Sequence, residues 1–118
     1  MAELTVYEKP TCTTCRNLWA LLGEHGIDAD RVNYHVTGLT EDDIRDLLRK
    51  ADMRPRDVLR TREPAYSDLA LGERELSDDE LIALMAQNPE LVQRPIVVRG
   101  DRAVLARPVE RVLELLDR

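Results

Sequence analysis

The chain has 118 residues, of which 43% are hydrophobic and 34% are charged, and its formal net charge is −6 at pH 7. This length is enough to bury a core without disulfides, so we expect residues 1–118 to form a single domain. The acidic balance argues against nucleic-acid binding, and neither a bilayer-spanning apolar run nor a secretory signal is seen, so we expect a cytoplasmic protein.

The first third of the chain predicts a strand, a helix and a second strand. Leu4–Tyr7 is a short apolar segment that ends at a turn, as strands do. A helical pattern runs from Cys15 to His25-Gly26, where glycine suits the left-handed conformation that follows a helix. Arg31–His35 then alternates polar and apolar residues, which is typical of a half-buried strand. This order predicts the opening of a parallel α/β unit.

The middle of the chain predicts helices joined by loops. Thr40 is suited to cap a helix, and Arg54–Gly72, which contains two prolines, is expected to hold one or two short helical turns. Ser77 and Glu80 form the capping-box pattern of a further helix that stops at Asn88-Pro89. Over all predicted helices, the apolar side chains expected to face the core are Leu18, Leu21, Leu22, Ile44, Leu47, Leu48, Ala51, Leu81, Leu84, Met85, Val109, Val112, Leu113 and Leu116.

The last part of the chain predicts a hairpin followed by a helix. Pro95–Arg99 and Arg102–Ala106 have strand character around a two-residue turn, and Pro108 is expected to be the first residue of the final helix. The complete order is β-α-β, a helical insertion, then β-β-α. It predicts an α/β, thioredoxin-like fold with a four-stranded mixed sheet. In that fold Pro95 would be a cis-proline beside the start of the first helix.

The only two cysteines, Cys12 and Cys15, lie three residues apart where the first strand gives way to the first helix. The unpaired N–H groups and the positive dipole end of a helix favour thiolate, which indicates redox or nucleophilic chemistry. A zinc site would need two more ligands, and His25 and His35 do not follow a ligand-like spacing. A purely structural disulfide would close a very short loop and remove little chain entropy.

Four segments carry a resemblance to a known family. They are Tyr7–Asn17, Val58–Thr61, Asn88–Val98 and Ala106–Pro108. On these segments, and from Thr5 to about Leu115, the chain resembles the ArsC or arsenate reductase family of the glutaredoxin-coupled type and its relatives, the Spx-like redox regulators.

The resemblance implies that Cys12 attacks arsenate and that Arg60, Arg94 and Arg107 hold the oxyanion. It implies no bound cofactor and no metal; instead an external thiol reductant, thioredoxin or glutathione with glutaredoxin, recycles the enzyme. Electrostatics supports these roles, because helix N–H groups and planar guanidinium groups offset the repulsion between a thiolate and an anionic substrate. Without the resemblance, Arg60 and Arg94 would also fit surface ion pairs or side chains that snorkel along apolar surface, and Arg107 would fit a neighbour of the N-cap of the final helix.

Two positions depart from the family pattern. Glu8 lies where glutaredoxin-coupled members carry a histidine, and a carboxylate near Cys12 would oppose thiolate formation unless it points away or arginines compensate. Cys15 lies where those members have serine, which provides a resolving thiol for the Cys12 adduct and favours recycling by thioredoxin. Direct resolution by glutathione, with glutaredoxin, stays open.

Two other functions share the thiol pair. A Spx-like regulator would bind RNA polymerase and sense oxidation through Cys12 and Cys15, and a general thiol-disulfide oxidoreductase would use the same two sulfurs on protein substrates. The three arginines favour the enzyme acting on an oxyanion, because neither alternative needs an anion clamp. We further expect a monomer, with no nucleic-acid or membrane partner.

Overall fold

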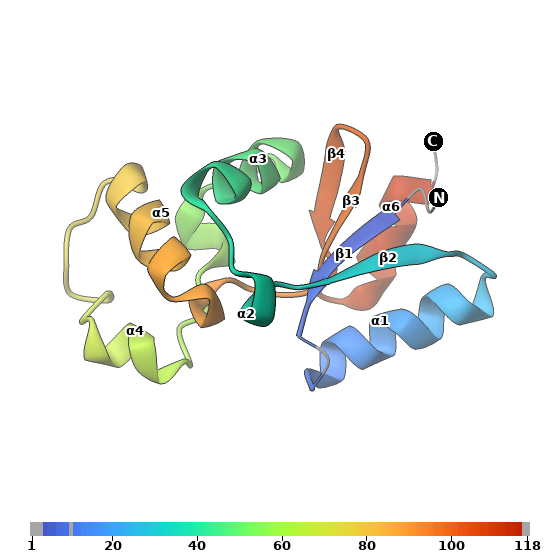
Figure 1. Ribbon diagram of the computed structural model, residues 1–118, viewed down its shortest axis with the longest axis horizontal. Helices are drawn as coiled ribbons and strands as arrows, with labels where there is room; N and C mark the ends of the chain where they lie inside the picture. Colours follow the sequence, from blue (N-terminus) through green and yellow to red (C-terminus); the bar gives the residue numbers. More distant parts are fainter. Residues whose placement is uncertain (1–3, 10, 117–118) are drawn as a thin grey trace. The chain divides into compact units, whose positions relative to one another are not determined.

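The computed structural model describes residues 4–9 and 11–116, and Figure 1 labels its helices and strands. The chain divides into two compact units. The first contains the residues up to Thr37 and those from Arg94 onward, and the second is Gly38–Gln93. The second unit thus corresponds to the predicted helical insertion, while the first holds every strand of the sheet.

The first unit is built on a four-stranded mixed sheet, as predicted (Figure 1). Its strands are β1 (Leu4–Glu8), β2 (Ala29–Asn33), β3 (Ile96–Arg99) and β4 (Arg102–Leu105), in the order β2-β1-β3-β4. β1 and β2 run parallel, because α1 (Thr13–Glu24) carries the chain back between them. The pairs β1–β3 and β3–β4 are antiparallel.

One face of this sheet carries the core of the first unit. Helix α1 and the C-terminal helical segment cover it, and their apolar side chains join those of the strands in one cluster. The buried members are Leu4, Val6, Leu18, Leu22, Val97, Val104, Ala106, Val112 and Leu115. Since side chains alternate along a strand, the residue two places after Val6 also faces inward, and that residue is Glu8.

The end of β2 differs from the prediction. The strand covers Ala29–Asn33, and Tyr34–Thr37 forms a short helix, α2, so His35 is not a strand residue. The Asn33 side-chain oxygen accepts a hydrogen bond from the backbone N–H of His35 at 3.2 Å, which favours a turn over a continuing strand. The alternation of polarity alone did not reveal this local competition.

The C-terminal helix also differs from the prediction. Pro108 is the extended N-cap residue of a 3₁₀ turn, η3 (Val109–Val112), which continues into one turn of α-helix, α6 (Leu113–Leu116). A 3₁₀ turn has three residues per turn, so the buried pair is Val112 and Leu115 rather than the full predicted face. Both the Arg107–Pro108 and the Arg94–Pro95 peptide bonds are cis, the second as predicted.

The first helix begins two residues earlier than predicted, at Thr13, and its end is confirmed. Gly26, just beyond it, has a φ of 63°, a conformation that a residue with a Cβ adopts only under strain. Leu18 and Leu22 are buried as expected, and Leu21 is half-buried. The helix start therefore lies directly after Cys12.

The second unit is helical. Its longer helices are α3 (Glu41–Ala51) and α5 (Asp78–Gln87), and its short elements are η1 (Pro55–Val58), α4 (Pro64–Asp68) and η2 (Pro89–Leu91). The predicted caps are confirmed: Thr40 caps α3 and Ser77 caps α5, each in a capping box. Its buried side chains include Ile44, Leu47, Leu48, Leu81, Ile82 and Met85, whereas Ala51 and Leu84 are half-buried. None of the helices in the described ranges has the length and apolarity to span a membrane.

Candidate active site

The two cysteines lie at the N-terminus of α1. Cys12 is the N-cap residue, and its carbonyl oxygen accepts the first helical hydrogen bond, from Arg16 N–H at 3.0 Å. Its own N–H donates to the carbonyl of Lys9 at 2.9 Å. Cys12 is half-buried and Cys15, one turn further, is fully buried; neither forms a disulfide. Only the first sulfur is therefore open to a substrate.

The environment of Cys12 favours its thiolate. Burial by itself would raise the pKa of the thiol, but the backbone N–H and the thiol of Cys15 donate hydrogen bonds to its sulfur. The guanidinium of Arg94 adds a hydrogen bond and a positive charge. Together these lower the pKa of Cys12 below its ordinary value of 9.0, which is what a nucleophilic cysteine requires.

The pKa of Cys15 is shifted in the opposite direction. Burial raises the pKa of its thiol to about 12, and a backbone hydrogen bond with Lys9 offsets this only in part. The hydrogen bond that Cys15 gives to Cys12, the Cys12 charge and the charge of Glu8 all favour the protonated form further. In the dithiol state these interactions favour a proton on Cys15 and a negative charge on Cys12.

Arg94 contacts the Cys12 sulfur through its guanidinium. It is only 5% exposed and precedes the cis bond to Pro95 at the start of β3. Burial alone would lower the pKa of Arg94, but hydrogen bonds and charge from Tyr34 and Cys12 raise it, so the side chain is a fixed cation.

Tyr34 and His35 support Arg94 and were not predicted as site residues. Tyr34 is fully buried and hydrogen-bonds the guanidinium, and His35 Nε2 lies 3.5 Å from Arg94 Nη1. The rings of Tyr34 and His35 lie 4.8 Å apart. The sequence offered one indication of their position. Both residues directly follow β2, whose carboxyl end lies beside that of β1 in a parallel pair.

Arg107 is joined to Arg94 rather than to a sulfur. It is exposed, and its Nη1 donates a hydrogen bond of 2.9 Å to the Arg94 carbonyl oxygen. The structure therefore brings Cys12, Cys15 and Arg94 together and attaches Arg107 to the backbone of this group.

Arg60 lies in the second unit. Its Nε is 3.2 Å from Glu63 Oε2, and its Nη1 donates to Gln93 Oε1 at 3.2 Å. The Arg60 backbone N–H donates to the Leu91 carbonyl at 2.7 Å. These contacts hold the guanidinium in a defined position within its own unit, and its role in binding substrate stays a prediction.

The sequence left open whether the Glu8 carboxylate opposes thiolate formation at Cys12, and the contacts of Glu8 bear on this point. The side chain is 1% exposed, accepts a hydrogen bond from Trp19 Nε1 at 2.8 Å and pairs with Arg31 Nε at 2.6 Å. Its charge raises the pKa of Cys15. The carboxylate is thus compensated by Arg31, and the arginine beside Cys12 is Arg94.

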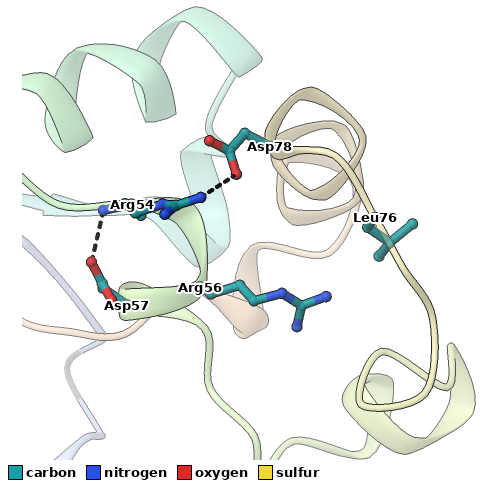
Figure 2. Close-up of a pocket in the computed structure, with 5 residues that line it drawn as sticks. All are labelled: Arg54, Arg56, Asp57, Leu76 and Asp78. Atoms are coloured by element: carbon teal, nitrogen blue, oxygen red, sulfur yellow. Dashed lines mark hydrogen bonds and ion pairs between the residues drawn. The ribbon is translucent and has the colours of Figure 1, made fainter.

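A separate cavity of about 320 Å³ lies in the second unit, and none of the predicted site residues lines it (Figure 2). Its lining residues are Arg54, Arg56, Asp57, Leu76 and Asp78. Arg54 lies between the two carboxylates, with its N–H 2.8 Å from Asp57 and its Nη2 3.9 Å from Asp78. Arg56 donates to two backbone carbonyls. With its arginines engaged in this way, the cavity is not arranged as an anion site.

Among residues 4–9 and 11–116, no group of three or more His, Cys, Asp or Glu side chains is placed to hold a metal ion.

The mixed sheet and the thiol pair at the start of the first helix define a thioredoxin-like protein, and the predicted fold is confirmed by solved structures. The arsenate reductase from Vibrio cholerae superposes with a TM-score of 0.90 at 36% identity, over 96% of this chain and 97% of that one. The chain belongs to the ArsC family, whose model matches residues 7–115.

Relatives of similar identity carry different names. The uncharacterized protein YfgD of Escherichia coli (strain K12) is 36% identical over 97% of each chain. A protein of the same strain named arsenate reductase is also 36% identical, over 98% of this chain and 82% of its own length. An arsenate reductase of Neisseria meningitidis serogroup A is 31% identical over 98% of this chain and 100% of its own.

Proposed function

We propose that this protein is an arsenate reductase in which Cys12 is the nucleophile. The observation that carries the proposal is the contact of the buried Arg94 guanidinium with the Cys12 sulfur at the start of α1. Relatives named arsenate reductase match nearly the whole chain, which adds independent support. Arg107 and Arg60 are the further arginines that we assign to the oxyanion.

The chemistry follows from the charges. The Cys12 thiolate attacks arsenic(V), an oxygen leaves as water, and a sulfur–arsenic bond forms. A second thiol then attacks the Cys12 sulfur; the sulfur–arsenic bond breaks, its electron pair stays on arsenic, and arsenite leaves while a disulfide remains. Each well-placed donor to the oxyanion is worth roughly 3 kcal/mol of transition-state stabilisation. Arg94 meets this requirement because it is already buried and charged before substrate arrives.

We assign the resolving role to Cys15 and the reducing role to thioredoxin. Cys15 donates its hydrogen bond to Cys12, so its sulfur is within reach of the adduct. Its proton must leave before it attacks, because the thiolate is the form that attacks the Cys12 sulfur and displaces arsenite from it. Glutathione with glutaredoxin is the alternative donor, and in that case Cys15 is dispensable. A monomer in the reducing cytoplasm suits either donor.

The test is arsenate-dependent NADPH oxidation, coupled separately to thioredoxin with its reductase and to glutathione with glutaredoxin. Cys12→Ser abolishes turnover with both donors, and Cys15→Ser abolishes it with thioredoxin only. Insulin reduction and pull-down of RNA polymerase serve as the competing assays. Rapid insulin reduction without arsenate turnover would favour a general oxidoreductase, and redox-dependent polymerase capture would favour a Spx-like regulator.

A further inference from the structure

His35 is a half-buried histidine that contacts an arginine of the site, and the proposed reaction does not use it. Its Nε2 lies 3.5 Å from Arg94 Nη1, and both residues belong to the first unit. The other histidine of the chain, His25, is exposed and is the C-cap residue of α1. His25 is therefore a natural control for any property that belongs to the site.

Local structure places the His35 ring. β2 ends at Asn33, which lies opposite Glu8, the last residue of β1 before the segment that leads to Cys12. The Asn33 side-chain oxygen accepts a hydrogen bond from the backbone N–H of His35 at 3.2 Å, and α2 begins at this point. The His35 ring then packs on the ring of the buried Tyr34, with centroids 4.8 Å apart and planes inclined by 35°.

The contact with Arg94 requires one protonation state of His35. A guanidinium has only N–H donors, so Arg94 Nη1 is the donor and His35 Nε2 is the acceptor. An imidazole nitrogen accepts only when it carries no proton, so the ring is neutral and its proton lies on Nδ1. A proton on Nε2 would instead set two N–H groups against each other, and a charged ring would also repel the guanidinium.

His35 and Tyr34 offer two acceptors to one buried cation. Arg94 is 5% exposed, and a buried charged group needs hydrogen bonds to hold it in place. Tyr34 hydrogen-bonds the same guanidinium, whereas Arg107 holds the Arg94 backbone carbonyl. The two residues at the start of α2 therefore orient the guanidinium that reaches the Cys12 sulfur.

We propose that His35, as the neutral ring with its proton on Nδ1, is a positioning residue that holds the Arg94 guanidinium against the Cys12 sulfur. Titratable neighbours of the ring come from three parts of the unit: Tyr34 of α2, Arg94 before β3 and, through Arg94, Cys12 at the start of α1. The inference deepens the proposed function, because it takes Arg94 to serve Cys12 as the nucleophile. Its tests need no arsenate.

The tautomer of His35 is the first test. Long-range 1H–15N correlation spectra of protein labelled with 15N-histidine distinguish the two ring nitrogens at pH 8, and His25→Gln assigns the signals. We expect the Nδ1–H tautomer at His35, whereas the exposed His25 exchanges between both tautomers. An Nε2–H tautomer at His35 overturns the proposal, because its Nε2 would then have no lone pair for Arg94.

Two substitutions separate the acceptor from the ring. His35→Gln keeps an acceptor near the position of Nε2 but loses the ring, and His35→Phe keeps a ring against Tyr34 but loses the acceptor. The readout is the pH midpoint of alkylation by iodoacetamide, with Cys12 identified as the modified residue by mass spectrometry. We expect His35→Phe to raise this midpoint by about one pH unit, while His35→Gln and the control His25→Gln leave it within about 0.3 unit of the wild type.

The reverse order would assign the effect to ring packing and would overturn the proposal. An equal shift in both His35 variants, or none in either, overturns it as well. If a variant does not fold, the tautomer of the wild-type protein still gives an answer. Failure of arsenate turnover leaves both measurements unaffected, so a wrong substrate and a wrong role for His35 are told apart.

Discussion

Arg107 Nη1 holds the carbonyl oxygen of Arg94 at 2.9 Å, so two arginines 13 residues apart are joined through a side chain and a backbone group. Arg94 in turn contacts the Cys12 sulfur through its guanidinium. The position of one cation thus depends on the other. Replacing Arg94 is expected to disturb both the thiolate and substrate binding, whereas replacing Arg107 is expected to change mainly substrate binding.

Arg94→Ala removes the cation that touches Cys12. Because this guanidinium lowers the pKa of Cys12, its loss raises that pKa and shrinks the thiolate fraction at neutral pH. We expect kcat/KM for arsenate to fall about 100-fold or more. The pH profile of iodoacetamide alkylation in a Cys15→Ser background measures the pKa directly. Arg111→Ala, an exposed arginine paired with Glu114, is the control, and an equal shift there would argue against a local effect.

Arg107→Lys tests the planar geometry of the second arginine. Lysine keeps the charge but cannot present parallel N–H groups to an oxyanion while bonding the Arg94 carbonyl. We expect KM for arsenate to rise about tenfold, with the pKa of Cys12 nearly unchanged. Steady-state kinetics with the coupled assay distinguish the two quantities. A variant with wild-type KM would remove Arg107 from the binding site.

Tyr34→Phe removes the buried hydroxyl that hydrogen-bonds Arg94. One such bond to a charged group contributes about 1.5–3 kcal/mol, and its loss lets the guanidinium move away from Cys12. We expect kcat/KM to fall about tenfold or more, with a slower alkylation of Cys12 at pH 7. Tyr66→Phe is the control, since it removes a tyrosine hydroxyl in the second unit.

The buried thiol makes stability depend on alkaline pH. The pKa of Cys15 is raised to about 12 from 9.0, so above pH 9 the unfolded chain loses a proton that the folded chain retains. The free energy of unfolding therefore falls by about 1.4 kcal/mol per pH unit between pH 9 and 12 on account of this group. Urea unfolding of the wild type and Cys15→Ala at pH 8, 9 and 10 measures the difference. Parallel curves for the two proteins would contradict the assignment.

The prediction of one domain has its own test. The only tryptophan, Trp19, lies in the first unit, whereas much of the helical signal comes from α3 and α5 in the second. If residues 1–118 unfold as one cooperative domain, tryptophan fluorescence and far-ultraviolet circular dichroism give the same urea midpoint. Two separate midpoints would indicate two independently folding parts.

The sequence predicted the parts of the fold that depend on local rules. Thr40 and Ser77 are caps because their side chains bond N–H groups three residues later, and Gly26 follows α1 because it tolerates a positive φ. The alternation in Arg31–His35 was misleading at its end. At that end, the Asn33 side chain accepts a hydrogen bond from the His35 backbone N–H, which favours a turn. The periodicity of polar and apolar residues cannot detect such a hydrogen bond.

The placement of the thiol pair was predictable because one segment holds both sulfurs, whereas contacts between separate segments were not. Cys12 and Cys15 share a helix start, but the opposite shifts of their pKa values also depend on Arg94, which lies far away in the sequence. The pairing of Glu8 with Arg31 depends on the register between β1 and β2, and the contact of Tyr34 with Arg94 joins residues 60 positions apart. These relationships exist only after the sheet has formed.

The burial of Cys15 has a consequence for how electrons enter this protein. Only Cys12 offers a sulfur to another molecule, so every mixed disulfide with a protein donor must be made at that single atom. In a Cys15→Ser protein no internal thiol can displace a donor from Cys12, so release depends on the donor's own second thiol. With arsenate present, a donor variant that lacks its second thiol would then remain attached at Cys12 and be recovered under non-reducing conditions as a stable adduct.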